Sequence, residues 1–308
     1  ACADTDDKEA ETQRNRLMTS LAAGDGEDVI VLSGLDDNAL AKKGVLMDLS
    51  DIVTPMEENG ELLQAIVDGE KAADGKQQIL PVRFALPLLL SKEKRASEMT
   101  DLAALAKAAE QTDGSLLGTF TGEDLVETFA PYFMPDIIKD KQLDTEKLRT
   151  VLQELQTIAA HCDMVEKYKK GERASNEWDL PSAMQAVLCQ ISGFNDAMFD
   201  LAIINLVKGD YTSFENAYIP TVEIGVNANT KQADLAKEFA AFVMSREVQD
   251  GDFYDGFPVN KESLHMQVSL DRSDYAAYTT IEGADGQEIG LDIEPIKAAD
   301  ADKLEALC

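Results

Sequence analysis

Cysteine, histidine and aromatic residues are scarce in this chain of 308 residues. Four cysteines are too few for the disulfide frameworks that hold small secreted folds together. Aromatic residues make up 6% of the sequence, and Trp178 is the single tryptophan. No apolar run approaches the ~18–20 residues of a membrane-spanning helix. The hydrophobic content of 44% therefore indicates a globular chain that buries its apolar residues in a core of its own.

Positive charge is also scarce. The chain has 28 Lys and Arg against 58 Asp and Glu, which gives a formal net charge of −30. Such a balance repels phosphate backbones and anionic lipid, so we expect no nucleic-acid partner. A solvated acidic surface explains the excess, and a negative cleft that steers cationic ligands such as polyamines or peptides is the alternative.

Sequence motifs of catalysis are missing as well. The chain has no G-x-S-x-G, H-E-x-x-H, Walker or G-x-G-x-x-G motif. His161 and His265 have no histidine or cysteine partner at the spacing of a zinc site. We therefore expect a binding protein and not an enzyme, with no catalytic residue, no metal ion and no cofactor.

Hydrophobic periodicity outlines the elements. Residues 29–32 form a short apolar run typical of a buried parallel strand, and a helix is expected over residues 37–43 before Gly44. A long apolar strand follows near residues 82–90, and the clearest helix covers residues 146–162. Short strands are expected near residues 115–120 and 186–191. A strand over residues 219–226 leads to a helix capped by Asn229, whereas residues 271–290 show no convincing period.

Two cysteines fall in apolar stretches. Cys162 continues the apolar stripe of the helix before it, and Cys189 lies in the run 186–191. We interpret both as reduced thiols in the core, and a bridge between them is the alternative.

Four segments carry a resemblance to a known family. They read LMTSLAAGDGEDVIVLSGLDDNALAKKGVLMDLSDIV from Leu17, LPVRFALPLLLSKEK from Leu80, TDLAALAKAAEQ from Thr100, and PTVEIGVNANTKQADLAKEFAAFVMSREVQ from Pro220, the last followed by DGFPVNKESL. In this order they resemble the extracellular solute-binding proteins of ABC importers, of the sugar-binding type to which maltose-binding protein belongs. Glu27 stands where the family usually has proline.

The resemblance implies an α/β fold of the two-lobed, type II periplasmic-binding-protein kind, with a hinge of crossing strands. It places the first lobe at residues 14–85 and 219–257 and the second lobe at residues 91–218. Residues 258–308 form a tail that returns toward the second lobe. Family members normally extend beyond both ends of this chain, so we expect it to be an excerpt or a reduced variant.

The candidate site rests on loops that follow predicted strands, because ligands of open α/β sheets bind beyond the strands' carboxyl ends. By resemblance these loops face the cleft between the lobes, with Phe194 as a ring that stacks on a sugar. Asp36, Glu123 and Asn195 are the expected polar contacts. The full set of ligand-binding candidates is Ser33, Gly34, Asp36, Thr121, Glu123, Trp178, Phe194 and Asn195.

The resemblance also implies the function. We expect an extracellular receptor that captures a small polar solute, with carbohydrate as the first class, and delivers it to an ABC permease in the membrane. The protein is expected to be a monomer, either periplasmic or tethered as a lipoprotein through Cys2. A sensory or interaction module that kept the fold is the alternative, followed by a carbohydrate-active hydrolase.

Overall fold

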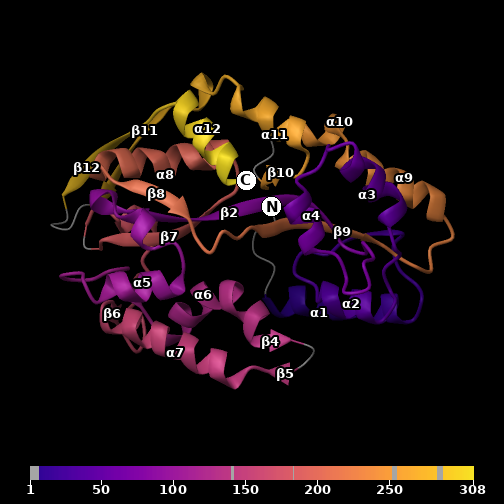
Figure 1. The fold of residues 1–308 in the computed structure, drawn as a ribbon, viewed down its shortest axis with the longest axis horizontal. Coiled ribbons are helices and arrows are strands. Elements are labelled where there is room, and N and C mark those ends of the chain that lie inside the picture. The colour runs from indigo at the N-terminus through magenta and orange to yellow at the C-terminus, as the bar shows by residue number, and fades with distance from the viewer. Residues whose placement is uncertain (1–6, 140–141, 183, 252–254, 283–286) are drawn as a thin grey trace. The chain divides into compact units, whose positions relative to one another are not determined.

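The computed structural model describes residues 7–139, 142–182, 184–251, 255–282 and 287–308 (Figure 1). Cys2 lies outside the described residues. The chain divides into two compact units: unit 1 comprises residues 1–85 and 220–270, and unit 2 comprises residues 86–219 and 271–308. None of the described helices has the length and apolar character needed to cross a membrane.

Unit 1 combines short strands with helices from both ends of its sequence. Its elements are α1 (Asp7–Ala22), β1 (Val29–Val31), α2 (Asp37–Lys42), α3 (Ser50–Glu58), α4 (Gln64–Gly69), the first half of β2 (Leu80–Ser91), β9 (Ile219–Val226, whose first residue belongs to unit 2), α9 (Ala233–Met244), α10 (Arg246–Gln249), β10 (Phe257–Pro258) and α11 (Lys261–Val268).

The predicted strands of unit 1 form, but β1 is not the parallel strand that its apolar run indicated. It pairs antiparallel with β9, with Val29 opposite Val226 and Val31 opposite Ile224. The strand is also not buried throughout, because Ile30 is buried but Val31 is 61% exposed. Strand direction is decided by pairing with a distant segment, which an apolar run does not show. A core cluster that includes Leu21 of α1 and Ile30 of β1 packs here.

Helix α9 begins at Ala233, later than the Asn229 cap predicted. The side chain of Asn227 accepts a hydrogen bond from the Asn229 N–H at 2.9 Å, and Thr230 Oγ1 accepts from the Gln232 N–H at 2.9 Å. These local bonds hold residues 227–232 in turns, so the helix starts after them.

Unit 2 contains the middle and the end of the chain, and elements labelled η are 3₁₀-helices. Its elements are the second half of β2, η1 (Lys92–Lys94), η2 (Ala96–Glu98), α5 (Leu102–Ala109), β3 (Thr119–Phe120), α6 (Gly122–Ile137), β4 (Ile138–Lys139), β5 (Gln142–Leu143), α7 (Thr145–Ala160), β6 (Asp163–Met164), η3 (Glu177–Asp179), β7 (Ala186–Ile191), α8 (Phe194–Val207), β8 (Asp210–Ser213), η4 (Ser273–Tyr275), β11 (Ala277–Glu282), β12 (Glu288–Ile293) and α12 (Ala298–Leu307).

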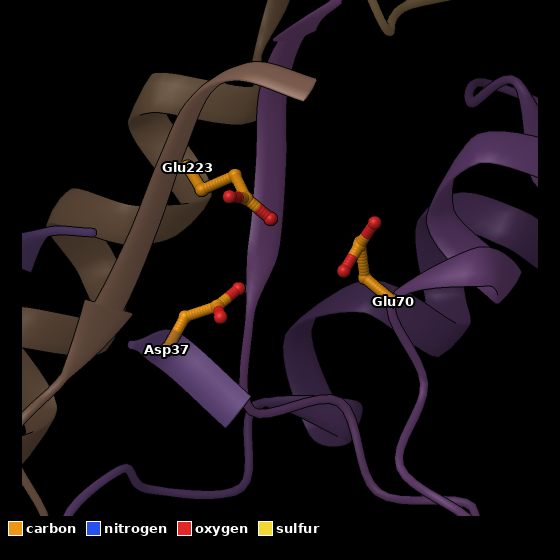
Figure 2. Close-up of side chains that lie close together, drawn as sticks. All are labelled: Asp37, Glu70 and Glu223. Atoms are coloured by element: carbon orange, nitrogen blue, oxygen red, sulfur yellow. The ribbon is translucent and has the colours of Figure 1, made fainter. Parts of the chain in front are cut away.

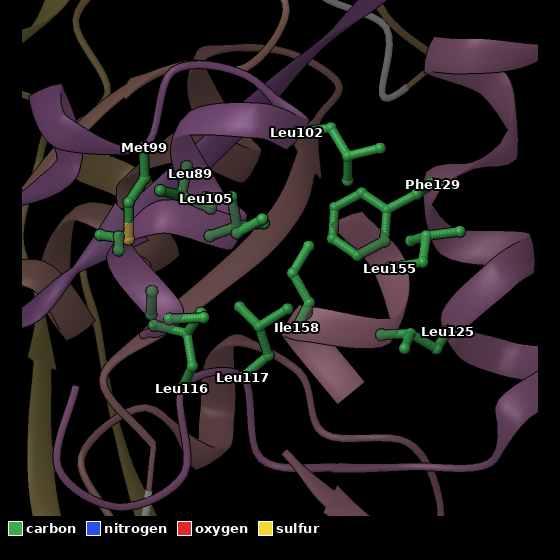
Figure 3. Packing of buried hydrophobic residues seen from close by; sticks show 14 of the residues in the cluster. Leu89, Met99, Leu102, Leu105, Leu116, Leu117, Leu125, Phe129, Leu155 and Ile158 are labelled. Atoms are coloured by element: carbon green, nitrogen blue, oxygen red, sulfur yellow. The ribbon is translucent and has the colours of Figure 1, made fainter. Parts of the chain in front are cut away.

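Strand β2 is buried along its whole length, as its nearly unbroken apolar sequence predicts. Its second half pairs antiparallel with both β7 and β8. Helix α7 packs against α5 and α6, and the three helices bury one large core. Figure 3 shows Leu102, Phe129, Leu155 and Ile158 meeting in that core.

The tail holds structure that periodicity did not predict. Strands β11 and β12 pair antiparallel from Ala277 opposite Ile293 to Glu282 opposite Glu288. Of the side chains described in this ladder, only Ile281 and Leu291 are buried, so the hydrophobic alternation that marks a half-buried strand is weak.

Cys162, Cys189 and Cys308 are free thiols. Cys162 lies just beyond the end of α7, packed against the core, and burial raises the pKa of its thiol to about 11.

Candidate functional site

Three carboxylates converge on unit 1. Asp37 lies in the first turn of α2, Glu70 at the C-terminal end of α4, and Glu223 on β9. Their side chains point toward one another, as Figure 2 shows, and their ligand oxygens all lie within 4.8 Å of one another. We call these three residues the acidic triad.

Pairing between β1 and β9 brings two members of the triad together. The Leu32 N–H, just past β1, donates to the Glu223 carbonyl at 2.8 Å, which sets Glu223 beside the turn that leaves β1. Gly34 makes that turn with a φ of 79°, a backbone conformation that glycine adopts without strain. Asp36 then accepts a hydrogen bond from the Ala39 N–H at 2.9 Å and caps α2, which places Asp37 in its first turn.

The electrostatics of the triad are those of crowded, half-buried acids. Burial, followed by the charges of Glu70 and Asp37, raises the pKa of Glu223 to about 8. Burial, followed by the charge of Asp37, raises the pKa of Glu70 to about 7. Near neutral pH the cluster therefore carries shared protons, and it both donates and accepts hydrogen bonds.

Two kinds of ligand suit such a cluster. Carboxylate oxygens at this separation are near enough to bind one hard cation such as Ca²⁺. The raised pKa values favour protons at the same oxygens. A cluster that exchanges protons near neutral pH is also suited to hydroxyl groups, each of which is both a donor and an acceptor.

The predicted loop after β1 lies beside the triad, and the ligand contacts expected of its residues stay predictions. The hydroxyl of Ser33 donates to the Thr221 carbonyl at 3.1 Å, and Gly34 is exposed with open space around it. Asp36 caps the helix, so its neighbour Asp37 and not Asp36 turns into the cluster.

In unit 2, Thr121 and Glu123 lie together at the start of α6. Thr121 is the N-cap: its side chain accepts from the Asp124 N–H at 3.2 Å and also contacts the Asp124 carboxylate. That side-chain contact is the first cause of a lowered pKa for Asp124. Glu123 is exposed in the first turn.

Phe194 is not the exposed stacking ring that was predicted. The segment 192–196 is not a free loop, because α8 begins at Phe194 itself. The ring is 1% exposed, and the guanidinium carbon of Arg272 lies 5.0 Å from its centroid. Asn195 accepts a hydrogen bond from Arg272 Nε at 2.9 Å. The ring is a packing residue here, and it offers no free face to a sugar.

Trp178 is partly exposed to solvent. Its side chain is 39% exposed, and its ring centroid lies 3.9 Å from that of Phe199. It lines a cavity of ≈ 410 Å³ in unit 2 together with Arg173, Asn176 and Asp179. A ligand role for this tryptophan stays a prediction.

The triad itself was missed by sequence reasoning. Asp37 directly follows the predicted ligand contact Asp36. Glu223 interrupts an otherwise apolar strand, which is a weak signal of a functional position. Nothing in the sequence around Glu70 marks it.

Comparison with known proteins identifies the family. The sequence pattern of the bacterial extracellular solute-binding proteins matches residues 5–250. The chain belongs to this family. This is a family of solute-binding proteins. No curated protein sequence matches the chain.

Solved structures confirm the α/β fold class of a solute-binding protein. An extracellular solute-binding protein of family 1 matches with a TM-score of 0.61 at 15% identity, covering 89% of this chain and 75% of that one. A periplasmic oligogalacturonide-binding protein from Yersinia enterocolitica gives 0.57 at 12% identity, covering 83% and 71%. A sugar transporter protein from Arthrobacter chlorophenolicus with bound laminaribiose gives 0.51 at 16% identity, covering 82% and 71%.

Proposed function

We propose that this solute-binding protein is the receptor of an ABC importer and captures a carbohydrate. The observation that carries the proposal is the family match over residues 5–250. The sugars named with two of the similar structures, laminaribiose and oligogalacturonide, support carbohydrate as the ligand class. Binding and release, without a chemical step, is the proposed activity.

The acidic triad is the proposed polar contact surface of unit 1. Carboxyl groups accept hydrogen bonds from sugar hydroxyls, and protonated ones also donate. Carboxylates repel one another and other anions, so the triad favours a neutral sugar over a uronic acid. Ser33 and Gly34 lie on the adjoining turn, and the exposure of both leaves them accessible to the same ligand.

The cellular location and the membrane partner of the protein follow from the same proposal. The family description supports a place outside the cytoplasm, with an ABC permease as the membrane partner. A monomeric state, a lipid tether at Cys2 and closure about crossing strands on ligand binding stay predictions. Closure requires that the ligand bind the closed arrangement better than the open one, and small-angle scattering with and without sugar tests it.

A cationic solute is the second candidate. It is favoured by the acidic triad together with the formal net charge of −30. Ionic strength separates the two candidates, because binding of a cation weakens steeply as salt rises, whereas binding of a neutral sugar does not.

The test is titration calorimetry against a panel of neutral disaccharides, beginning with laminaribiose, and against spermidine. Asp37→Asn should weaken sugar binding by roughly tenfold or more, since a hydrogen bond to a charged group contributes about 1.5–3 kcal/mol. Asp25→Asn, an exposed acid elsewhere on unit 1, is the matched control and should bind as the parent does. If the folded protein binds no sugar in the panel but binds spermidine in a salt-sensitive way, the carbohydrate proposal is wrong.

A further inference from the structure

An apolar groove with a volume of ≈ 470 Å³ opens among α5, α6 and α7 of unit 2. Its floor includes the buried residues Leu102, Phe133 and Ile137 and the half-buried residues Tyr132 and Val151. All five belong to the core cluster of the unit or pack against it, so the floor is the exposed margin of that core. The volume lies in the usual range of small-molecule pockets, roughly 300–1,000 Å³.

The rim of the groove carries charge of nearly one sign. Five carboxylates and a single lysine line it: Asp101, Asp136, Glu146, Glu154, Glu215 and Lys147. Lys147 Nζ lies 3.7 Å from the carboxylate of Asp136, so this lysine already forms an ion pair with one of the acids. Arg149 Nη1 likewise lies 3.6 Å from the carboxylate of Glu146, so five carboxylates against two cations leave the rim negative around an apolar floor.

Local hydrogen bonds fix two of these acids in place. The Asp101 carboxylate accepts from the Ala104 N–H at 2.8 Å as the N-cap of α5. The Glu215 carboxylate accepts from the Leu102 N–H at 2.8 Å. Burial, followed by the charge of Asp101, raises the pKa of both Glu154 and Glu215 above that of an ordinary glutamate. The acids repel one another, and a positive charge among them would relieve that repulsion.

We propose that this groove is a second binding site and takes a small organic cation with an apolar body, of the class of protonated alkylamines. The alkyl part would cover Val151 and Tyr132, and the ammonium would lie among the carboxylates of the rim. The charge of the rim rejects anions, and the apolar floor favours an alkyl chain over a bare metal ion.

The groove is distinct from the residues proposed for sugar binding. The acidic triad belongs to unit 1. On unit 2, Thr121 and Glu123 lie at the N-terminal end of α6, whereas Tyr132 lies eleven residues beyond Thr121. At the rise of an α-helix this is roughly 16 Å along the axis. Occupation of the groove would thus not compete directly with sugar at those residues.

The experiment is titration calorimetry of the whole chain with n-hexylammonium as the probe. Hexanol, which keeps the alkyl chain without the charge, and hexanoate, which reverses the charge, are the matched ligand controls. We expect saturable binding of one hexylammonium per chain, weaker binding of hexanol and none of hexanoate. Rising salt should weaken the binding of hexylammonium.

Three variants locate the site. Glu154→Gln should weaken hexylammonium binding by about twofold to fivefold, the range of a partly exposed ion pair. Glu127→Gln makes the same chemical change at an exposed position of α6 outside the groove and should have no effect. Ala103→Trp places a large ring in the groove from an exposed position on α5 and should abolish binding. Circular dichroism confirms that each variant is folded.

The proposal is overturned if hexylammonium does not bind saturably, or if the folded Glu154→Gln and Ala103→Trp variants bind it as the parent does. It is equally overturned if Glu223→Gln, and not Glu154→Gln, removes binding, because the cation then occupies the acidic triad of unit 1. In neither case is sugar binding at the triad contradicted.

Discussion

The carboxyl oxygens of Glu70 and Glu223 lie within 4.8 Å of each other on unit 1, with Asp37 as the third member of the triad. Glu70 ends a helix and Glu223 lies in a strand far along the chain. Burial, followed by the charge of Asp37 on Glu70 and the charges of Glu70 and Asp37 on Glu223, raises their pKa values to about 7 and about 8. The charge of the triad therefore changes near neutral pH. Both stability and ligand binding should respond to that change.

Glu223→Gln should flatten the dependence of stability on pH. In the parent the native state keeps protons on Glu70 and Glu223 that the unfolded chain has lost, so these groups lower the free energy of unfolding as pH rises from 4.5 to about 8. The variant should therefore be more stable than the parent at alkaline pH, by about 1 kcal/mol after allowance for solvent screening. Urea unfolding on both sides of this interval measures the difference.

The matched control for that experiment is Glu58→Gln, at an exposed glutamate of α3. It should follow the parent at every pH. Parallel stability curves for the parent and Glu223→Gln would contradict the raised pKa of Glu223.

Phe194→Ala should destabilise the protein and leave sugar affinity unchanged. The ring is buried in unit 2 beside Arg272, and truncating a buried phenylalanine costs about 3–5 kcal/mol. Phe194→Leu keeps most of the apolar volume and should cost clearly less. Thermal unfolding and calorimetry on the same samples give both quantities. A loss of affinity with stability preserved would restore the stacking role.

Arg83→Met should reduce the stability of unit 1 by about 3 kcal/mol, since it leaves buried carbonyl groups without their donor. Arg83 is 2% exposed, and its guanidinium donates to the carbonyls of Val248, Gln249 and Gly251 at 3.3–3.4 Å.

The comparison for Arg83→Met is Lys237→Met. Lys237 Nζ lies 2.7 Å from an Asp51 carboxylate that is largely exposed. A pair of this kind contributes about 1 kcal/mol or less. Equal losses in the two variants, measured by denaturant unfolding, would show that the contacts of Arg83 do not stabilise the unit.

Thr121→Ala should cost about 1 kcal/mol, the usual effect of removing a helix N-cap. Thr121 caps α6, and Thr121→Ser keeps the hydroxyl and should keep the stability. Sugar affinity measured on both variants separates the cap from the predicted ligand contact. If Thr121→Ala binds sugar more weakly while Thr121→Ser binds as the parent does, the hydroxyl also contacts the ligand.

Elements with a local signal could be predicted from the sequence alone. The strand over residues 219–226 is confirmed with those bounds, and β1, β2 and α7 lie where apolar runs or a helical stripe predicted them. These elements can be predicted because burial of one or both faces makes apolar residues recur along the sequence with a fixed period or as a continuous run. The α/β class followed from the resemblance of four sequence segments to the solute-binding family.

The pairing partners of the strands and the members of the acidic triad depend on contacts between distant segments. The direction of β1 depends on β9, and the β11–β12 ladder is held by pairing that leaves few buried side chains. Asp36 and Asp37 are neighbours of the same type, yet one caps a helix and the other faces Glu70 and Glu223. The sequence predicted that Phe194 lies in an exposed loop, whereas Arg272, in the segment after residue 258, lies over its ring. A side chain's role at such positions depends on groups far away in the sequence, and no local pattern of residues records them.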